Sequence, residues 1–122
     1  MSNFQRRVVQ SNYDIYSAQG TLTNASAALL TAGSHDVLVV DTILLTEYSN
    51  NARTVTLRHV DSGDTDDATA NFLTDLALAA NETFEETFGG NGGIVLRAGA
   101  ALKGLASANT SVNYLISYRK EA

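Results

Sequence analysis

Residues 76–102, LALAANETFEETFGGNGGIVLRAGAAL, decide between two fold classes. Within them, LAANETF (78–84) and LRAGAAL (96–102) share one pattern, in which Asn81 and Gly99 hold the same place. Asn and Gly are the residues that most readily accept a positive φ, which a tight reversal between strands often requires. The repeated pattern therefore favours a turn at each site, with strands at about 71–78, 83–88, 94–96 and 101–107.

Two alternatives compete with this interpretation. Residues 68–80 also fit a helix, because one helical face would carry four apolar residues: Leu73, Leu76, Ala77 and Ala80. The glycine-rich GGNGG (89–93) could in turn be a phosphate-binding loop. Such a loop needs the pattern G-x-x-x-x-G-K-S/T at the start of a helix, whereas here the lysine is missing and the strand-like Ile-Val-Leu follows. A connecting loop is favoured.

Strand patterns recur along the rest of the chain. VLVVDTILLTEY (37–48) is apolar on both faces, as in a central strand, and SNNA (49–52) is a turn cluster leading to the alternating RTVTLRHV (53–60). VNYLISYR (112–119) also alternates. With about seven or eight short strands, the sequence predicts an all-β fold, an antiparallel β-sandwich of the jelly-roll or immunoglobulin-like kind. The predicted core comprises Ile43, Leu45, Leu57, Leu96, Val112, Tyr114 and Ile116.

The first part of the chain has a different composition. Residues 1–36 are rich in Ser, Asn, Gln, Thr and Ala and show no sustained periodicity, so we expect an N-terminal arm (1–36) before a sandwich domain (37–122), with one short strand near 13–16. The arm is either a frayed terminus or a segment that docks on a neighbouring subunit. The second interpretation predicts interface residues in the arm, with Val9 beside them: Phe4, Arg6, Arg7, Val8, Tyr13, Ile15 and Tyr16.

Composition excludes several classes of function. The 122 residues include no Cys, so neither a disulfide framework nor a cysteine-ligated zinc site is expected. The net charge of −5 argues against nucleic-acid binding, which depends on cationic contacts to phosphate. No apolar run approaches the roughly 20 residues that span a bilayer, and the N-terminus does not resemble a signal peptide. We expect a soluble protein made in a cytoplasm, without nucleic-acid or membrane partners.

Candidate reactive groups are few, and no catalytic residue, metal ligand or cofactor is predicted. His35 and His59 have no second His or Cys at ligand spacing, and His59 is expected in the core or an interface. The loop DSGDTDD (61–67) is interpreted as a solvated acidic loop, with calcium binding left open. The charges at Glu82, Glu85 and Glu86 suit an exposed edge strand better than a catalytic pair.

Within residues 41–118, three segments in this order carry a resemblance: ILLTEYSNNARTVTLRHVDSG, FLTDLALAANETFEETFGG and GIVLRAGAALKGLASANTSVNYLISY. They are similar to a family of small β-sandwich proteins of tailed bacteriophages, whose genes are usually encoded among virion structural genes. The similarity lies in strand and turn patterns. Neither the N-terminal arm nor the acidic loop contributes to it, and the family offers no catalytic residues to carry over.

The resemblance implies a non-enzymatic virion structural protein, made in the host cytoplasm, that decorates or cements the capsid. Such a protein would act as a homo-oligomer, expected to be a trimer, and would bind the major capsid protein or other virion proteins. A neck or tail accessory protein of the virion is the second candidate. A carbohydrate-binding module is the third, although the chain has no Trp and its Tyr114 and Tyr118 are expected to face inward.

Overall fold

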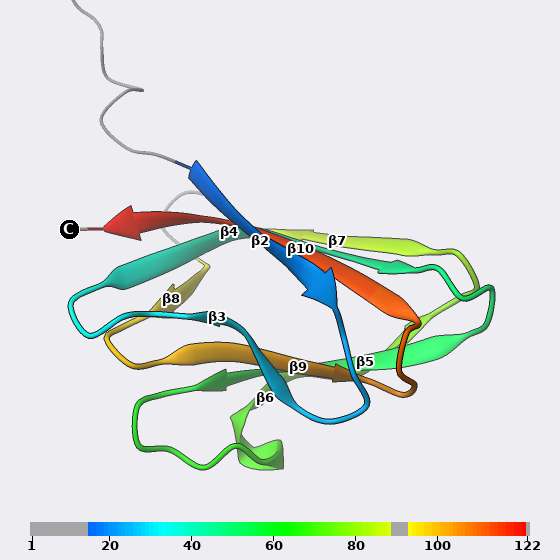
Figure 1. Ribbon diagram of the computed structural model, residues 1–122, viewed down its shortest axis with the longest axis horizontal. Helices are drawn as coiled ribbons and strands as arrows, with labels where there is room; N and C mark the ends of the chain where they lie inside the picture. Colours follow the sequence, from blue (N-terminus) through cyan, green and yellow to red (C-terminus); the bar gives the residue numbers. More distant parts are fainter. Residues whose placement is uncertain (1–14, 89–92, 122) are drawn as a thin grey trace, which may run out of the picture.

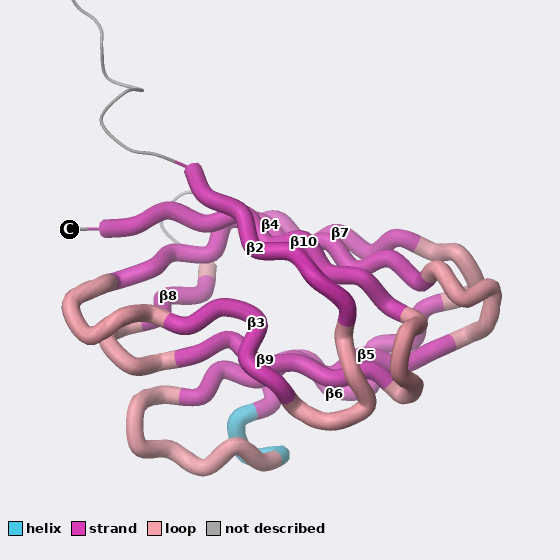
Figure 2. The backbone as a smooth tube through the Cα atoms, in the orientation of Figure 1, coloured by secondary structure: helices cyan, strands magenta, loops and turns pink. Residues whose placement is uncertain are grey.

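The computed structural model describes residues 15–88 and 93–121. These residues form an all-β fold with one 3-10 turn, η2 (Ala68–Ala70), and contain no α-helix. The strands, which are magenta in Figure 2, are β2 (Ile15–Thr21), β3 (Ala27–Thr31), β4 (Val37–Glu47), β5 (Arg53–Val60), β6 (Asn71–Leu78), β7 (Thr83–Thr87), β8 (Ile94–Leu96), β9 (Ala101–Ala106) and β10 (Val112–Glu121).

The strands form two antiparallel sheets packed face to face (Figure 1). One has the order β2-β10-β4-β7, with β8 also paired to β4, and the other has the order β3-β9-β5-β6. The pairings are nested along the chain, because β2 pairs with β10, β3 with β9, β4 with β7 and β5 with β6. A long hairpin rolled into two sheets in this way is a jelly roll, which resolves the choice left open by the sequence.

The core lies between the sheets and agrees with the sequence-based expectation at six of seven positions. Ile43, Leu45, Leu57, Leu96, Val112 and Ile116 are all buried. Tyr114 is only half-buried and packs against the core from its rim. The alternating pattern therefore located the inward face of each strand correctly.

The two predicted turns are confirmed by their backbone angles. Asn81 has a φ of 62° between β6 and β7, and Gly99 has a φ of 82° between β8 and β9. The helical alternative for 68–80 is wrong, because residues 71–78 pair with β5 as a strand. The helix-like spacing arises from an irregularity in β6. Asp75 adopts a φ of 50°, and Leu73 and Leu76, three residues apart, both pack against the core.

Residues 15–36 differ from the expected arm. They contribute β2 and β3, one to each sheet, and three buried residues: Leu22, Leu30 and Ala32. The described chain therefore shows no boundary between arm and sandwich at residue 36. The expected short strand near 13–16 overlaps only the start of β2. Periodicity missed the rest because its half-buried positions are the small Ala18 and Gly20, and Gly20 lies beneath the ring of its cross-strand partner Tyr114.

Candidate functional site

The predicted interface residues fall into two groups. Phe4, Arg6, Arg7, Val8 and Tyr13 lie outside the described residues, as does Val9. Ile15 and Tyr16 begin β2, where their exposed fractions are 66% and 36%. These two are among the large apolar or aromatic side chains that the described structure leaves exposed, together with Tyr48 and Phe72.

Tyr16 belongs to an aromatic cluster on the β2–β10 pair, in which Tyr118 is half-buried and packs against the core. It lies opposite Tyr118 in the register, and the two rings stack with centroids 5.5 Å apart. The ammonium of Lys120 lies 5.3 Å from the centroid of the Tyr16 ring, within range of a cation–π contact. These contacts hold the Tyr16 ring in place at the start of β2, where the neighbouring Ile15 points to the other face of the sheet.

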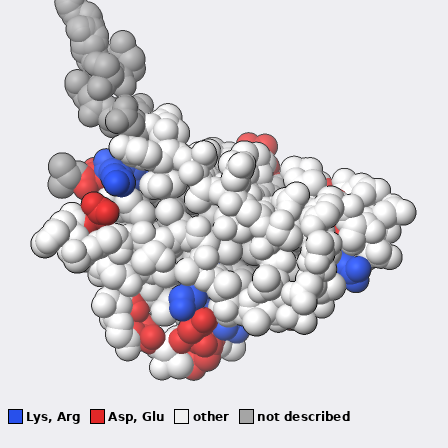
Figure 3. All heavy atoms as spheres, in the orientation of Figure 1, with Lys and Arg blue, Asp and Glu red and all other residues white. Residues whose placement is uncertain are grey.

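Within the described residues, the outer edge of β2 carries none of the charges that commonly block pairing with other chains. β2 is the edge strand of its sheet, and none of its seven residues is charged. β3, the edge strand below it, is also uncharged. In Figure 3 the charged side chains of this face gather near its periphery and leave a broad uncharged centre. An uncharged edge is a template for pairing with another strand.

The opposite side of the sandwich has acidic edges. β7 is an edge strand there and carries the exposed Glu85 and Glu86, as the sequence predicted, while β6 carries the exposed Asp75. Glu82 accepts a hydrogen bond from the Ala79 amide at 2.7 Å across the β6–β7 turn. Its carboxylate therefore closes a turn, which is a structural role.

Between these two acidic edges the sheets leave an apolar cavity of about 170 Å³, which we call the β6–β7 slot. It is lined by Ile43, Leu57, Phe72, Leu73, Phe84, Glu86 and Phe88. Phe72 is 42% exposed, so the slot carries aromatic surface to the outside. Glu86 is its one charged lining residue, which makes the slot apolar inside and acidic on its rim.

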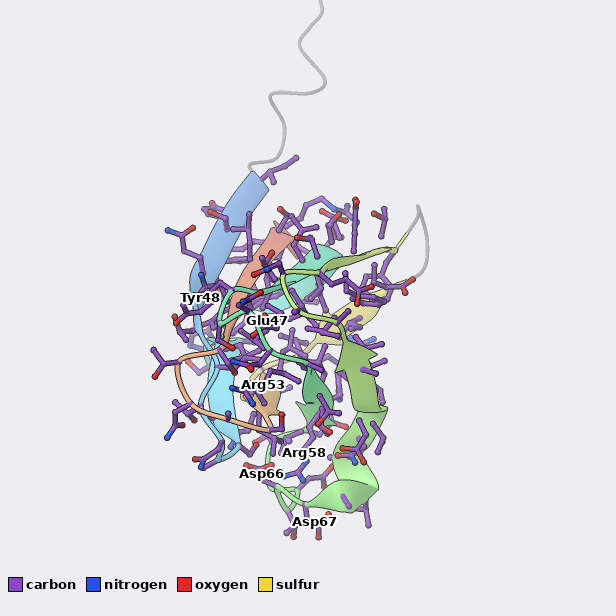
Figure 4. The ribbon with its side chains drawn as sticks, turned by 90° about the vertical axis from the view of Figure 1, so that its right-hand side faces the viewer. Glu47, Tyr48, Arg53, Arg58, Asp66 and Asp67 are labelled. Carbon is purple, nitrogen blue, oxygen red and sulfur yellow. The ribbon has the colours of Figure 1, made fainter. Side chains whose placement is uncertain are left out.

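Glu47 is a buried carboxylate that the sequence analysis did not single out (Figure 4). It accepts backbone hydrogen bonds from Ser49, Asn50 and Asn51 at 2.9, 3.0 and 3.3 Å, another from Asn81 at 3.0 Å, and one from the Ser49 hydroxyl. Burial acts to raise the pKa of Glu47, but the hydrogen bonds from Asn81, Ser49 and Asn51 outweigh it and lower the pKa to about 2. Glu47 thus joins two turns as an ionised group.

The acidic loop 61–67 is held by contacts with neighbouring segments of the same chain. Asp66 meets Arg58 at 3.0 Å, Lys103 at 3.5 Å and the Ser26 hydroxyl at 3.0 Å, and the Arg58 hydrogen bond lowers the pKa of its carboxyl. Asp67 caps η2 by accepting from the Thr69 amide at 2.9 Å. Figure 4 shows Arg58, Asp66 and Asp67 together, away from Glu47. Across residues 15–88 and 93–121, no three His, Cys, Asp or Glu side chains are grouped as a metal site requires.

His59 connects the two sheets. It is half-buried on β5, and its Nε2 donates a hydrogen bond to the Val95 carbonyl of β8, 2.9 Å away. Its Nδ1 lies 3.7 Å from Asp61. This agrees with the expected core or interface position. His35 is exposed in the loop between β3 and β4.

The slot and the Glu47 cluster were both missed by sequence reasoning, although each left a signal. Phe84 and Glu86 of β7 and Phe88 directly after it alternate in sequence and all line the slot. Glu47 ends a strand directly before the polar Ser-Asn-Asn of the next turn, whose backbone donors it accepts. Neither pattern identifies a site by itself. Alternation occurs in most strands, and a carboxylate near a turn is usually solvated.

Comparison with known proteins gives a fold likeness and no family. No protein-family model and no curated protein sequence matches the chain. A solved structure of Bacillus endospore appendages, described as a novel family of disulfide-linked pili, matches with a TM-score of 0.52 and 16% identity. The match covers 98% of this chain and 92% of that chain. At this identity the likeness shows that the two proteins share a fold.

Within the described ranges, no helix is long and apolar enough to cross a membrane.

Proposed function

We propose that this chain is a non-enzymatic structural subunit that assembles with copies of itself into a larger protein particle. The observation that carries the proposal is the β2 edge, an uncharged seven-residue strand at the edge of the described sheet, with Ile15 and Tyr16 exposed at its start. Proteins that remain monomeric usually block such edges with charges, bulges or covering segments. Here the charges stand at the opposite edge, on Glu85 and Glu86 of β7.

The size of the protein supports the same conclusion. A domain of 122 residues buries a limited share of its surface, so association adds stability that the single chain lacks. The exposed Ile15 and the Tyr16–Tyr118 stack offer apolar area on β2, which among residues 15–88 and 93–121 pairs with β10 alone. Pairing at this edge would bury both at once.

At a finer level, we propose that the particle is the virion of a tailed bacteriophage and that the chain decorates or cements its head. The strand and turn resemblance within residues 41–118 supports this assignment. On this proposal the partners are two further copies in a trimer and the major capsid protein, with a neck or tail position as the variant of the same role. The protein would be made in the host cytoplasm and act in the virion.

A filament is the second candidate, favoured by the fold likeness to the appendage protein over 98% of this chain. The pili of that protein are described as disulfide-linked, whereas the present chain has no Cys. A filament of this chain would therefore be held by non-covalent contacts. A head-to-tail contact gives a ring where the rotation closes and a filament where it does not, so both forms can share one edge contact.

The carbohydrate-binding alternative gains no specific support. Flat sugar platforms need adjacent exposed aromatic rings, and the exposed Tyr16, Tyr48 and Phe72 lie on β2, the β4–β5 loop and β6. Because three separate elements carry them, they do not form one surface along a strand.

The test places a charge on the β2 edge. Ser17 is exposed in the middle of β2, so Ser17→Lys leaves the core intact while it blocks strand pairing. Ala98→Lys, in the exposed β8–β9 turn, adds the same charge elsewhere and is the matched control. Electron microscopy of the purified chain should show rings or filaments for the unchanged protein and for Ala98→Lys. It should show dispersed subunits for Ser17→Lys.

Two outcomes would contradict the proposal. One is a dispersed chain before any substitution, and the other is assembly that Ser17→Lys leaves unchanged. The finer assignment is tested on purified phage particles that lack this protein. Co-sedimentation of the added chain with such particles supports a virion role, and a chain that stays in the supernatant contradicts it.

A further inference from the structure

We infer that the β6–β7 slot is the docking site for the N-terminal residues 1–14 of a second copy of this chain. The inference rests on the proposed self-association and specifies which surfaces meet. The slot is an apolar cavity of about 170 Å³ at the side of the sandwich opposite β2. Its exposed Phe72 and half-buried Phe84 and Phe88 provide an aromatic surface that a partner can cover.

The composition of residues 1–14 complements the slot. Their apolar side chains, Phe4, Val8, Val9 and Tyr13, suit its aromatic interior, and their two cations, Arg6 and Arg7, suit its acidic rim. Glu86 lines the slot, and Glu85 is exposed next to it on β7. Arginine pairs with carboxylates through a planar fork of donors, which adds orientation to the apolar contact.

The direction of β2 favours a second copy over the chain's own slot. Ile15 pairs with Arg119, and Arg119 pairs with Val39, so β2 begins level with the start of β4. The slot lies further along β4, where Ile43 pairs with Glu86 and Leu45 with Phe84 of β7. β2 runs from the level of Val39 toward the level of Thr46, so the direction from Thr21 to Ile15 points away from the slot. To reach its own slot, the chain would have to reverse and cross the sheet.

The length of the segment is sufficient for a neighbouring subunit. Fourteen extended residues span at most about 45–50 Å. The first sheet is four strands wide from β2 to β7, and strands are spaced by about 4.8 Å, so the width of a subunit is well within this reach. A segment that leaves from one side of the sandwich and docks on the other side of the next copy makes a head-to-tail contact, which gives rings or filaments.

Cysteine cross-linking of full-length chains tests the docking, because the natural chain has no Cys to interfere. One chain carries Val8→Cys, the other carries Phe72→Cys, and the two are mixed under mild oxidation. Phe72 is 42% exposed, so its substitution spares the core. Since each chain has a single Cys, a disulfide between them reports contact between copies. Thr31→Cys, exposed on β3 at the other edge of the second sheet, replaces Phe72→Cys as the control.

The expected result is a cross-linked heterodimer in the Val8–Phe72 mixture and its loss in the Val8–Thr31 mixture. Charge reversal gives a second readout. Glu86→Arg should reduce the cross-linked yield, and Arg6→Glu with Arg7→Glu on the Val8→Cys chain should restore it. Restoration identifies the ion pairs, because general loss of folding would not be rescued from the other chain.

The contradicting results separate this inference from the proposed function. If the chain self-associates by light scattering but the Val8–Phe72 mixture cross-links no more than the control, the docking site is wrong and the self-association stands. If the chain is monomeric, both fail. If a single chain with Val8→Cys and Phe72→Cys forms an internal disulfide while the mixture does not, the segment occupies its own slot and the second copy is excluded.

Discussion

The Glu47 carboxylate at the end of β4 accepts a hydrogen bond from the backbone amide of Asn81, 3.0 Å away in the β6–β7 turn. Through the same carboxylate it holds the β4–β5 turn, at Ser49, Asn50 and Asn51. One buried charge therefore ties together two turns, although Glu47 and Asn81 are 34 residues apart in sequence. Glu47 therefore connects the turn that joins β4 to β5 with the turn that joins β6 to β7.

Replacing Glu47 with Gln should destabilise the fold. The amide nitrogen of Gln is a donor and would face backbone N–H donors, leaving buried groups unsatisfied. Glu86→Gln makes the same chemical change at an exposed position and is the control. Thermal unfolding followed by circular dichroism should show a clear fall in melting temperature for Glu47→Gln and almost none for Glu86→Gln. Equal melting temperatures would mean that the Glu47 hydrogen bonds contribute nothing.

Stability should also depend on acid pH through Glu47. Its pKa falls from an ordinary 4.5 to about 2 in the folded chain, so the folded state favours the ionised form. The resulting stabilisation is complete above about pH 4.5 and is lost as the pH falls toward 2. Asp66 and Asp67 also have lowered pKa values and act in the same direction. Urea unfolding between pH 2 and 6 should therefore show a shallower acid dependence in Glu47→Gln than in the unchanged chain.

The turn at Gly99 requires glycine more strictly than the loop at Gly63. Both have a positive φ, at 82° and 85°, so a side chain at either costs about 1–2 kcal/mol. A Cβ at Gly99 would also lie 2.9 Å from Ser62, whereas a Cβ at Gly63 meets nothing within 4 Å. Gly99→Ala should thus lower the free energy of unfolding more than Gly63→Ala. Equal losses in urea titrations would remove the steric argument.

Ile116 tests the inward face of β10. It is fully buried between the sheets, and truncation to Ala should cost about 2–5 kcal/mol of unfolding free energy. Leu115, the next residue, points to the other face and is only half-buried, so Leu115→Ala should cost clearly less. If chemical denaturation shows a loss below about 0.5 kcal/mol for Ile116→Ala, the residue does not carry the core packing that its burial implies.

Strand alternation and turn chemistry predicted much of this fold from sequence. The pattern shared by Asn81 and Gly99 placed two turns correctly, and alternation identified the buried face at Ile43 and Ile116. The expected short strand near 13–16 met only the start of β2, because the half-buried positions further along are the small Ala18 and Gly20, and the Tyr114 ring lies against Gly20. The apolar side chain at this position comes from Tyr114 on β10, so the residues of β2 alone do not show the alternating pattern of a strand.

The candidate sites were harder to predict because they depend on contacts between distant segments. Glu47 meets Asn81 only after the hairpins roll together, and nothing local distinguishes it from an exposed carboxylate. The slot combines β4 and β5 residues with Phe72 and Phe84 from two edge strands of different sheets. The acidic loop was correctly placed outside the core, but its pairing of Asp66 with Arg58 and Lys103 required the structure.

Removal of residues 2–14 should separate folding from assembly. The deletion leaves both sheets complete, since β2 begins at Ile15, so the far-ultraviolet circular dichroism should remain that of a β-protein. Self-association should weaken, because the segment proposed to fill the β6–β7 slot is gone. Sedimentation velocity of the intact and shortened chains measures this directly. Identical sedimentation of both at matched concentration would show that the segment makes no contact between subunits.

The central claim is that this chain associates with copies of itself, and the absolute mass of the purified full-length protein tests it most directly. Light scattering coupled to size-exclusion chromatography measures that mass without reference to shape. The account predicts a whole multiple of the 12.9 kDa chain, with three copies for the proposed trimer. A mass of 12.9 kDa at every concentration, up to the limit of solubility, would contradict the claim.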